Sequence, residues 1–243
     1  MEKDPSTASN TVKHLTTPGG SSWVGLVDGI YAIAMTLIAI DLPELIRTLL
    51  SLPRSLADNA LITRLVIYEF TAYIATFLVL YDLWSHHRCV LKIGGLKRQT
   101  QNLLNGFILS LSCLGAGNII LVLNEKASTA TEAIRKNVGE KVLFSTWVNS
   151  HSSLVLVTFM MVAIMFFAMA IMARSSTEYS TSTDLRHLSK DLFRKGFFFF
   201  VALTTWIPKI LGQPLPMPPA ILVIIFIAIS YNQHHIARAF RKE

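Results

Sequence analysis

The chain has few charged residues and almost no cysteine. Charged residues make up 15% of its 243 residues, hydrophobic residues make up 52%, and the mean hydropathy is +0.48. Soluble domains contain about 25% charged residues, so this composition argues against a soluble domain and indicates a membrane protein with several spans. The two cysteines, Cys89 and Cys113, fall at a predicted helix end and inside a predicted span. That placement argues against a disulfide framework, a zinc site or a redox role.

The sequence also lacks the common catalytic motifs. It contains no Gly-x-Ser-x-Gly, no His-Glu-x-x-His and no glycine loop that would cradle a phosphate. Its adjacent histidines, His86 with His87 and His234 with His235, point about 100° apart on a helix and cannot easily share a metal ion. We therefore expect no enzymatic activity, no metal site and no cofactor. The Thr-Val-Gly-Tyr-Gly filter of ordinary potassium channels and the arginine ladder of a voltage sensor are also missing.

Long hydrophobic runs, by contrast, fill most of the chain. A membrane helix needs about 20 mostly apolar residues. Six segments meet this requirement, at roughly 23–42, 65–85, 102–123, 152–173, 194–212 and 219–236. The predicted fold class is therefore all-α, a polytopic membrane protein with six transmembrane helices in a domain over residues 22–236. Residues 1–21 are polar and lack the layout of a signal peptide, so we expect a disordered cytoplasmic tail there and a short cytoplasmic tail at 237–243.

The net charge of +7 is distributed unevenly along the chain. With the N-terminus inside, the inner segments hold fourteen of the 22 lysines and arginines, and the outer loops hold eight. The positive-inside rule then predicts that both termini are cytoplasmic and that the protein lies in the cell membrane. Basic residues that flank spans usually anchor anionic headgroups, so we expect the lipid bilayer, and not nucleic acid, as their partner.

The first predicted span carries an apolar stripe with a single hydroxyl. At about 100° per residue, Ile33, Thr36, Leu37 and Ile40 share one narrow face, and Asp28 falls on roughly the opposite side. A stripe of this kind can meet copies of itself around an axis and line a pore. The alternative is that these side chains face lipid or pack against another helix.

Two short motifs resemble those of a known family. The first runs from Asp28 to Leu37 as Asp-Gly-x-x-Ala-Ile-Ala-x-Thr-Leu, and the second is Trp84-Ser-His-His-Arg88. They are similar to motifs in the first helix and at the end of the second helix of the lysosomal and endosomal potassium channel family called transmembrane protein 175. The family pattern usually opens with Arg, three residues, and then Phe-Ser before the Asp. This chain departs from that opening at three positions, which hold Ser22, Leu26 and Val27.

The resemblance implies a potassium-permeable cation channel with potassium as the permeant ion. It implies that Ile33, Leu37 and Ile40 form a hydrophobic constriction, which can close a pore by dewetting, and that Thr36 forms a hydroxyl layer that replaces part of the water around the ion. It also implies a homotetramer, because relatives with two six-span units per chain work as dimers and this chain has one unit. The expected partners are then other copies of this chain, the lipid bilayer and potassium ions.

Asp28 is expected to lie at the same cytoplasmic depth as Trp84, His86 and His87, because the first span runs outward and the second returns. A carboxylate inside a span needs a partner or a wet cavity. The resemblance implies that these four residues form a hydrogen-bond network between helices, with one histidine as a possible pH sensor. The alternative is that Asp28 only caps the first turn of its helix.

Two acids, Asp41 and Glu44, close the first span on its outer side. Repeated around a symmetric axis, they would form an acidic outer vestibule that concentrates cations. The alternative is that Asp41 and Pro43 simply end the helix. Asp82 lies four residues before His86 and can pair with it along the helix.

Three other functional classes stay open. A proton-coupled secondary transporter could relay protons through Asp28 and His86 or His87, although the sequence shows neither the internal repeats nor the broken helices that transporters usually have. An intramembrane hydrolase could use Asp and His side chains. A structural or interaction protein would carry no ion flux at all.

Overall fold

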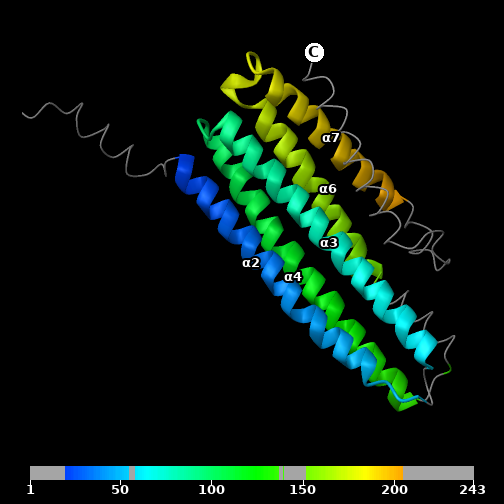
Figure 1. Cartoon of the computed structure of the whole chain (residues 1–243). Helices are drawn as coiled ribbons and strands as arrows, with labels where there is room; N and C mark the ends of the chain where they lie inside the picture. The colour runs from blue at the N-terminus through cyan, green and yellow to red at the C-terminus, as the bar shows by residue number, and fades with distance from the viewer. Residues whose placement is uncertain (1–19, 55–57, 137–138, 140–151, 205–243) are drawn as a thin grey trace, which may run out of the picture.

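The described part of the chain is a bundle of antiparallel helices. The structure is a computed structural model that describes residues 20–54, 58–136, 139 and 152–204, and within these ranges it contains helices and no strand. The elements are α2 (Gly20–Leu50), α3 (Asn59–Gly94), α4 (Gln99–Lys136), α6 (Ser152–Arg174), the short 3₁₀ helix η1 (Thr177–Tyr179) and α7 (Thr183–Thr204). Consecutive α-helices run in opposite directions along one bundle axis (Figure 1). α2 packs against α3 and α4, whereas α7 packs mainly against α6.

Four of these helices contain stretches long and apolar enough to cross a membrane: Ser22–Leu50, Asn59–Gly94, Gln99–Thr129 and Leu156–Arg174. They correspond to the first four predicted spans, which confirms the prediction of an all-helical membrane protein. The predicted fifth span at 194–212 begins inside α7, and its last eight residues lie outside the described residues. The predicted sixth span at 219–236 and the tail at 237–243 also lie outside them, as do residues 1–19.

The first helix does not end at Asp41 or Pro43, so that alternative is wrong. α2 continues to Leu50 with Pro43 inside it. A proline removes one backbone hydrogen bond, and tertiary contacts can offset this loss. Here Leu45 and Leu49 of α2 are buried against Leu61 and Leu65 of α3, which holds the outer end of the helix in place.

The ends of α3 follow from its sequence. Asp58 precedes the helix, and its Oδ1 accepts a hydrogen bond from the backbone N–H of Leu61 at 2.7 Å, which satisfies a donor that the first turn leaves unpaired. At the other end Gly95 adopts a φ of 62°, and its N–H donates to the carbonyl oxygen of Leu91 at 3.0 Å. Only glycine takes this conformation readily. The tight turn after Gly95 reverses the chain, and α4 then runs back along the bundle against α2 and α6.

Candidate functional site

The predicted apolar stripe faces away from the rest of its own chain. The exposed fractions of Ile33, Leu37 and Ile40 are 61%, 44% and 63%, and Thr36 is also exposed. The opposite side of α2 is buried in the bundle core, with Tyr31 and Ile38 both 1% exposed. The stripe therefore does not pack within the described part of the chain. It is available to lipid or to another copy of the protein.

The hydroxyl of Thr36 is oriented by its own helix. Its Oγ1 donates a hydrogen bond to the backbone carbonyl oxygen of Ala32 at 2.8 Å. Threonine hydroxyls commonly bond in this way to the carbonyl four residues earlier in a helix. Because the proton is used internally, the oxygen keeps lone pairs that can accept from water or contact a cation.

Asp28 joins α2 to α3 through Trp84. The indole Nε1 of Trp84 donates to Oδ1 of Asp28 at 2.7 Å, and the guanidinium of Arg88 lies 3.7 Å from Oδ2. The same guanidinium sits over the Trp84 ring, 5.5 Å from its centroid. Because α2 begins at Gly20, Asp28 lies about two turns inside the helix. The alternative in which Asp28 caps the first turn is therefore wrong.

His87 belongs to a different contact from the one made by Asp28. Its side chain is buried, and its Nε2 lies 2.8 Å from Oδ1 of Asn105 on α4. The ring of Tyr31 from α2 meets it edge-on, with centroids 6.0 Å apart. These three residues connect α2, α3 and α4 through the interior of the bundle.

His86 points instead toward α7, where it joins a group we call the inner ion cluster, made of Asp82, His86, Asp191 and Lys195. Along α3, Nδ1 of His86 lies 2.7 Å from the carbonyl oxygen of Asp82 and 3.3 Å from its carboxylate. Across to α7, Nε2 of His86 lies 3.2 Å from Oδ2 of Asp191. Lys195 is 4% exposed and places Nζ 2.9 and 2.8 Å from the two carboxylate oxygens of Asp82. The predicted single network of Asp28, Trp84, His86 and His87 is thus three separate groups.

The inner ion cluster can carry a zero net charge. As an imidazolium, His86 donates to the Asp82 carbonyl and to Asp191, and it balances the two carboxylates together with Lys195. As a neutral ring protonated on Nδ1, it can accept from Lys195, whose Nζ lies 3.2 Å from Nε2. Burial alone would raise the pKa of Asp191, but the hydrogen bond from His86 and the charge of Lys195 outweigh burial and hold this pKa below its usual value. The cluster thereby ties the middle of α7 to the C-terminal part of α3.

The acidic outer vestibule stays a prediction, but the structure adds a basic residue beside its two acids. Glu44 is exposed and Asp41 is half-exposed. Because α2 stays helical to Leu50, a period of about 100° per residue places Glu44 and the exposed Arg47 on the same face as Ile40. A basic residue therefore follows the stripe directly after the acid.

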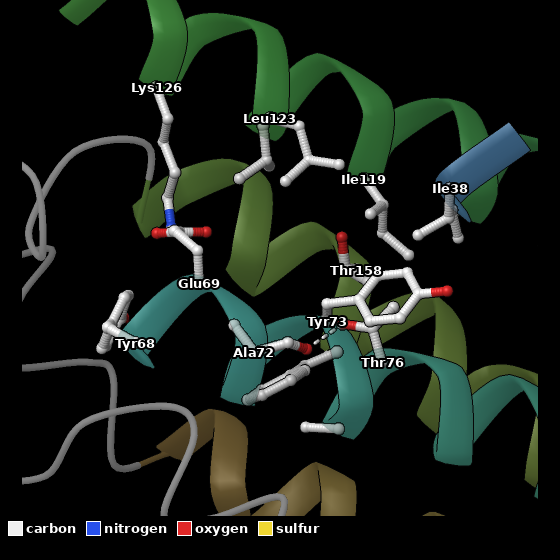
Figure 2. Close-up of a pocket in the computed structure, with 13 residues that line it drawn as sticks. Ile38, Tyr68, Glu69, Ala72, Tyr73, Thr76, Ile119, Leu123, Lys126 and Thr158 are labelled. Carbon is white, nitrogen blue, oxygen red and sulfur yellow. Dashed lines mark hydrogen bonds and ion pairs between the residues drawn. The ribbon is translucent and has the colours of Figure 1, made fainter. Parts of the chain in front are cut away.

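A second buried ion pair joins α3 and α4 toward their outer ends. Glu69 is 1% exposed, and its Oε1 accepts a hydrogen bond from Nζ of Lys126 at 2.6 Å. The Lys126 ammonium also lies over the ring of Tyr68, 5.1 Å from its centroid. Beside this pair, residues of α2, α3, α4 and α6 line a cavity of about 120 Å³ (Figure 2). The cavity lies behind α2, on the side opposite the exposed stripe.

The sequence predicts the pairing of His86 with Asp82, but it does not predict Lys126 as the partner of Glu69 or Asp191 and Lys195 as further members of the inner ion cluster. The predicted third span ends at residue 123 and so leaves Lys126 in an outer loop, whereas α4 continues to Lys136. The charge pattern places Lys195 among the inner basic residues and predicts no particular contact for it. The available signal was an acid and a base at similar depth on neighbouring antiparallel spans.

Comparison with known families agrees with the motif analysis. The family model described as endosomal/lysosomal potassium channel TMEM175 matches residues 23–114. This range includes most of α2, all of α3 and the first part of α4. The match confirms the resemblance seen in the two motifs. No curated protein and no solved structure matches this chain.

Proposed function

We propose that the chain is a subunit of a potassium-permeable cation channel, because the model of the TMEM175 potassium channel family matches residues 23–114. The observation that carries the proposal is that the family match covers α2, whose apolar stripe, Ile33, Leu37 and Ile40, is turned away from its own bundle. The family is one of channels and not of enzymes, which supports conduction over catalysis.

The channel is a homotetramer with α2 around the central axis. One chain presents the stripe on an outer surface and does not surround it, so an enclosed ion path needs several copies. Each chain has six spans in a domain over residues 22–236, in the cell membrane, with both tails, 1–21 and 237–243, in the cytoplasm. The excess of basic residues in the predicted inner segments supports this orientation.

Conduction is controlled by the width and wetting of the α2 stripe. Rings of Ile33, Leu37 and Ile40 form a narrow apolar throat, which empties of water and blocks ions when it closes. Thr36 adds one layer of oxygen lone pairs between these rings, since its proton is held by Ala32. Four such oxygens replace part of the hydration shell of potassium and give a modest selectivity. No cofactor is needed for this passive flux.

The inner-end contacts hold the pore helix in register. Asp28 and Trp84 fix the depth of α2 relative to α3, and His87 extends the connection to α4. His86 acts on the other side of α3, where it secures α7. At the outer end, Asp41 and Glu44 attract cations, and Arg47 reduces that attraction because it shares the face of Glu44.

The direct test is potassium flux through purified protein in liposomes with a potassium gradient, together with chemical crosslinking to establish the number of subunits. We expect flux down the gradient without a second solute, and crosslinked species up to the tetramer. A monomer would remove the axis on which the pore depends. A strict requirement for a proton gradient would favour the alternative proton-coupled transporter using Asp28 and the Trp84, His86 and His87 residues, which the family match does not support.

A further inference from the structure

The cavity behind α2 is lined by residues of four helices. Ile38 comes from α2, Tyr73 and Thr76 come from α3, Ile119 comes from α4 and Thr158 comes from α6, and the Glu69–Lys126 pair closes one end. Figure 2 shows Lys126 reaching from α4 to Glu69, with Ile119 and Tyr73 further along the same space. Its volume of about 120 Å³ is close to that of an engineered apolar cavity of about 150 Å³ that binds benzene.

The polar end of the cavity favours a neutral molecule. Glu69 and Lys126 lie 2.6 Å apart and carry opposite charges, so the described residues that line the cavity contribute no net charge with which to hold an ion. An ammonium group has three protons; one goes to Glu69 and another is directed at the Tyr68 ring, which leaves one for a ligand oxygen. The Thr76 hydroxyl donates a hydrogen bond to the Ala72 carbonyl oxygen at 2.9 Å, so its own oxygen can accept a hydrogen bond from a ligand hydroxyl.

The remaining walls are apolar and partly aromatic. The lining includes the aromatic side chains of Tyr73 and Phe159 together with aliphatic side chains. Flat rings pack well against such surfaces in offset or edge-on geometry. Tyr73 also lines a second hollow between α2 and α3, next to Ala39 and Leu42. Its side chain therefore borders both spaces.

We propose that this cavity is a binding site for a compact, neutral aromatic alcohol, and that an occupant restrains opening of the pore. The second half of this inference rests on the proposed function. If the exposed stripe lines the axis, the pore widens only when α2 moves toward its own bundle. Ile38 is on the bundle side of α2, next in sequence to Leu37, and it borders the cavity. A ligand that fills this space blocks the movement of α2 into it.

The binding test uses radiolabelled phenol in equilibrium dialysis against the purified full chain in detergent, which requires no conduction. We expect saturable binding of one phenol per chain. Ala72→Leu places a larger side chain in the cavity wall and should abolish it. Thr76→Val removes one hydrogen-bond acceptor with little change in shape and should weaken binding about threefold to tenfold.

The matched control is Thr71→Val. Thr71 lies on the same helix and makes the same hydroxyl-to-carbonyl bond, to Ile67 at 2.8 Å, but it does not line the cavity. This variant should bind phenol like the parent. Absence of saturable binding, or binding that persists in Ala72→Leu, would overturn the site. A lipid that co-purifies with the parent and is lost from Ala72→Leu would identify an acyl chain as the occupant and overturn the ligand class.

Flux measurements test the second half separately. Phenol should lower potassium flux in the parent and in Thr71→Val at concentrations that saturate the dialysis site, and should leave flux through Ala72→Leu unchanged. Equal inhibition of Ala72→Leu would overturn the proposed restraint, because it would show that phenol acts elsewhere. If the parent binds phenol but conducts no potassium with or without it, the channel function fails while the binding site stands.

Discussion

Replacing Lys126 by methionine tests whether the buried Glu69 pair holds the outer halves of α3 and α4 together. The variant keeps the length and apolar stem of the side chain but removes the ammonium that lies 2.6 Å from the carboxylate. Glu69 is 1% exposed and the Lys126 side chain is 9% exposed, so bulk solvent does not solvate the carboxylate once the ammonium is removed. Removal of one member of a buried pair typically costs about 3–5 kcal/mol. We expect a loss of unfolding free energy in this range.

The assay is equilibrium unfolding in mixed micelles with increasing SDS, followed by circular dichroism. Lys136→Met is the matched control, because Lys136 lies on the same helix and pairs with Glu132 at 2.5 Å, with both side chains more than half exposed. An exposed pair of this kind contributes about 0.3–0.5 kcal/mol. The two lysine variants should therefore differ severalfold in their effect.

A double variant separates the cost of leaving the Glu69 carboxylate without Lys126 from the contribution of the pair itself. Glu69→Leu combined with Lys126→Met leaves no charge at this place, and replacing a buried pair with apolar residues is often neutral or stabilising. We expect most of the lost stability to return. If Lys126→Met costs no more than Lys136→Met, or if the double variant is less stable than Lys126→Met alone, the carboxylate of Glu69 does not depend on Lys126 and the reasoning is wrong.

The remaining predictions concern the pore helix. Leu37→Asn should raise resting potassium leak at least about tenfold, equivalent to about 1.4 kcal/mol of barrier, because a polar ring stays wet; Ile67→Asn, at an exposed position on α3, should not. Asp28→Asn should lower the free energy of unfolding by about 1.5–3 kcal/mol, and with it the yield of tetramer, without changing ion preference. Altered selectivity in a folded variant would place Asp28 in the ion path. Thr36→Ala should conduct with a potassium-to-sodium ratio close to one, and an unchanged reversal potential would mean that selectivity is set elsewhere. Arg47→Gln should increase cation conductance at low salt, and the increase should vanish near 1 M salt, where charges are screened beyond about 3 Å.

The charged residues show where sequence reasoning stops. The pairing of Asp82 with His86 was predictable, because both lie on one helix at a spacing of four residues. The contact of Asp28 with Trp84 followed from their matching depth in antiparallel spans. Lys195 was not predictable as a partner of Asp82, since 113 residues separate them and α7 had to be placed against α3 first.

The sequence alone determined the helical membrane architecture and the stripe on the first helix. In lipid the backbone must satisfy its hydrogen bonds internally, so an apolar run of sufficient length forms a helix whatever surrounds it. The helical period then assigns each residue to a face. Tertiary structure decided which groups meet. His86 and His87 are adjacent, yet one faces Asp191 on α7 and the other Asn105 on α4, because neighbouring side chains diverge by about 100° and contact whichever helix lies on their side.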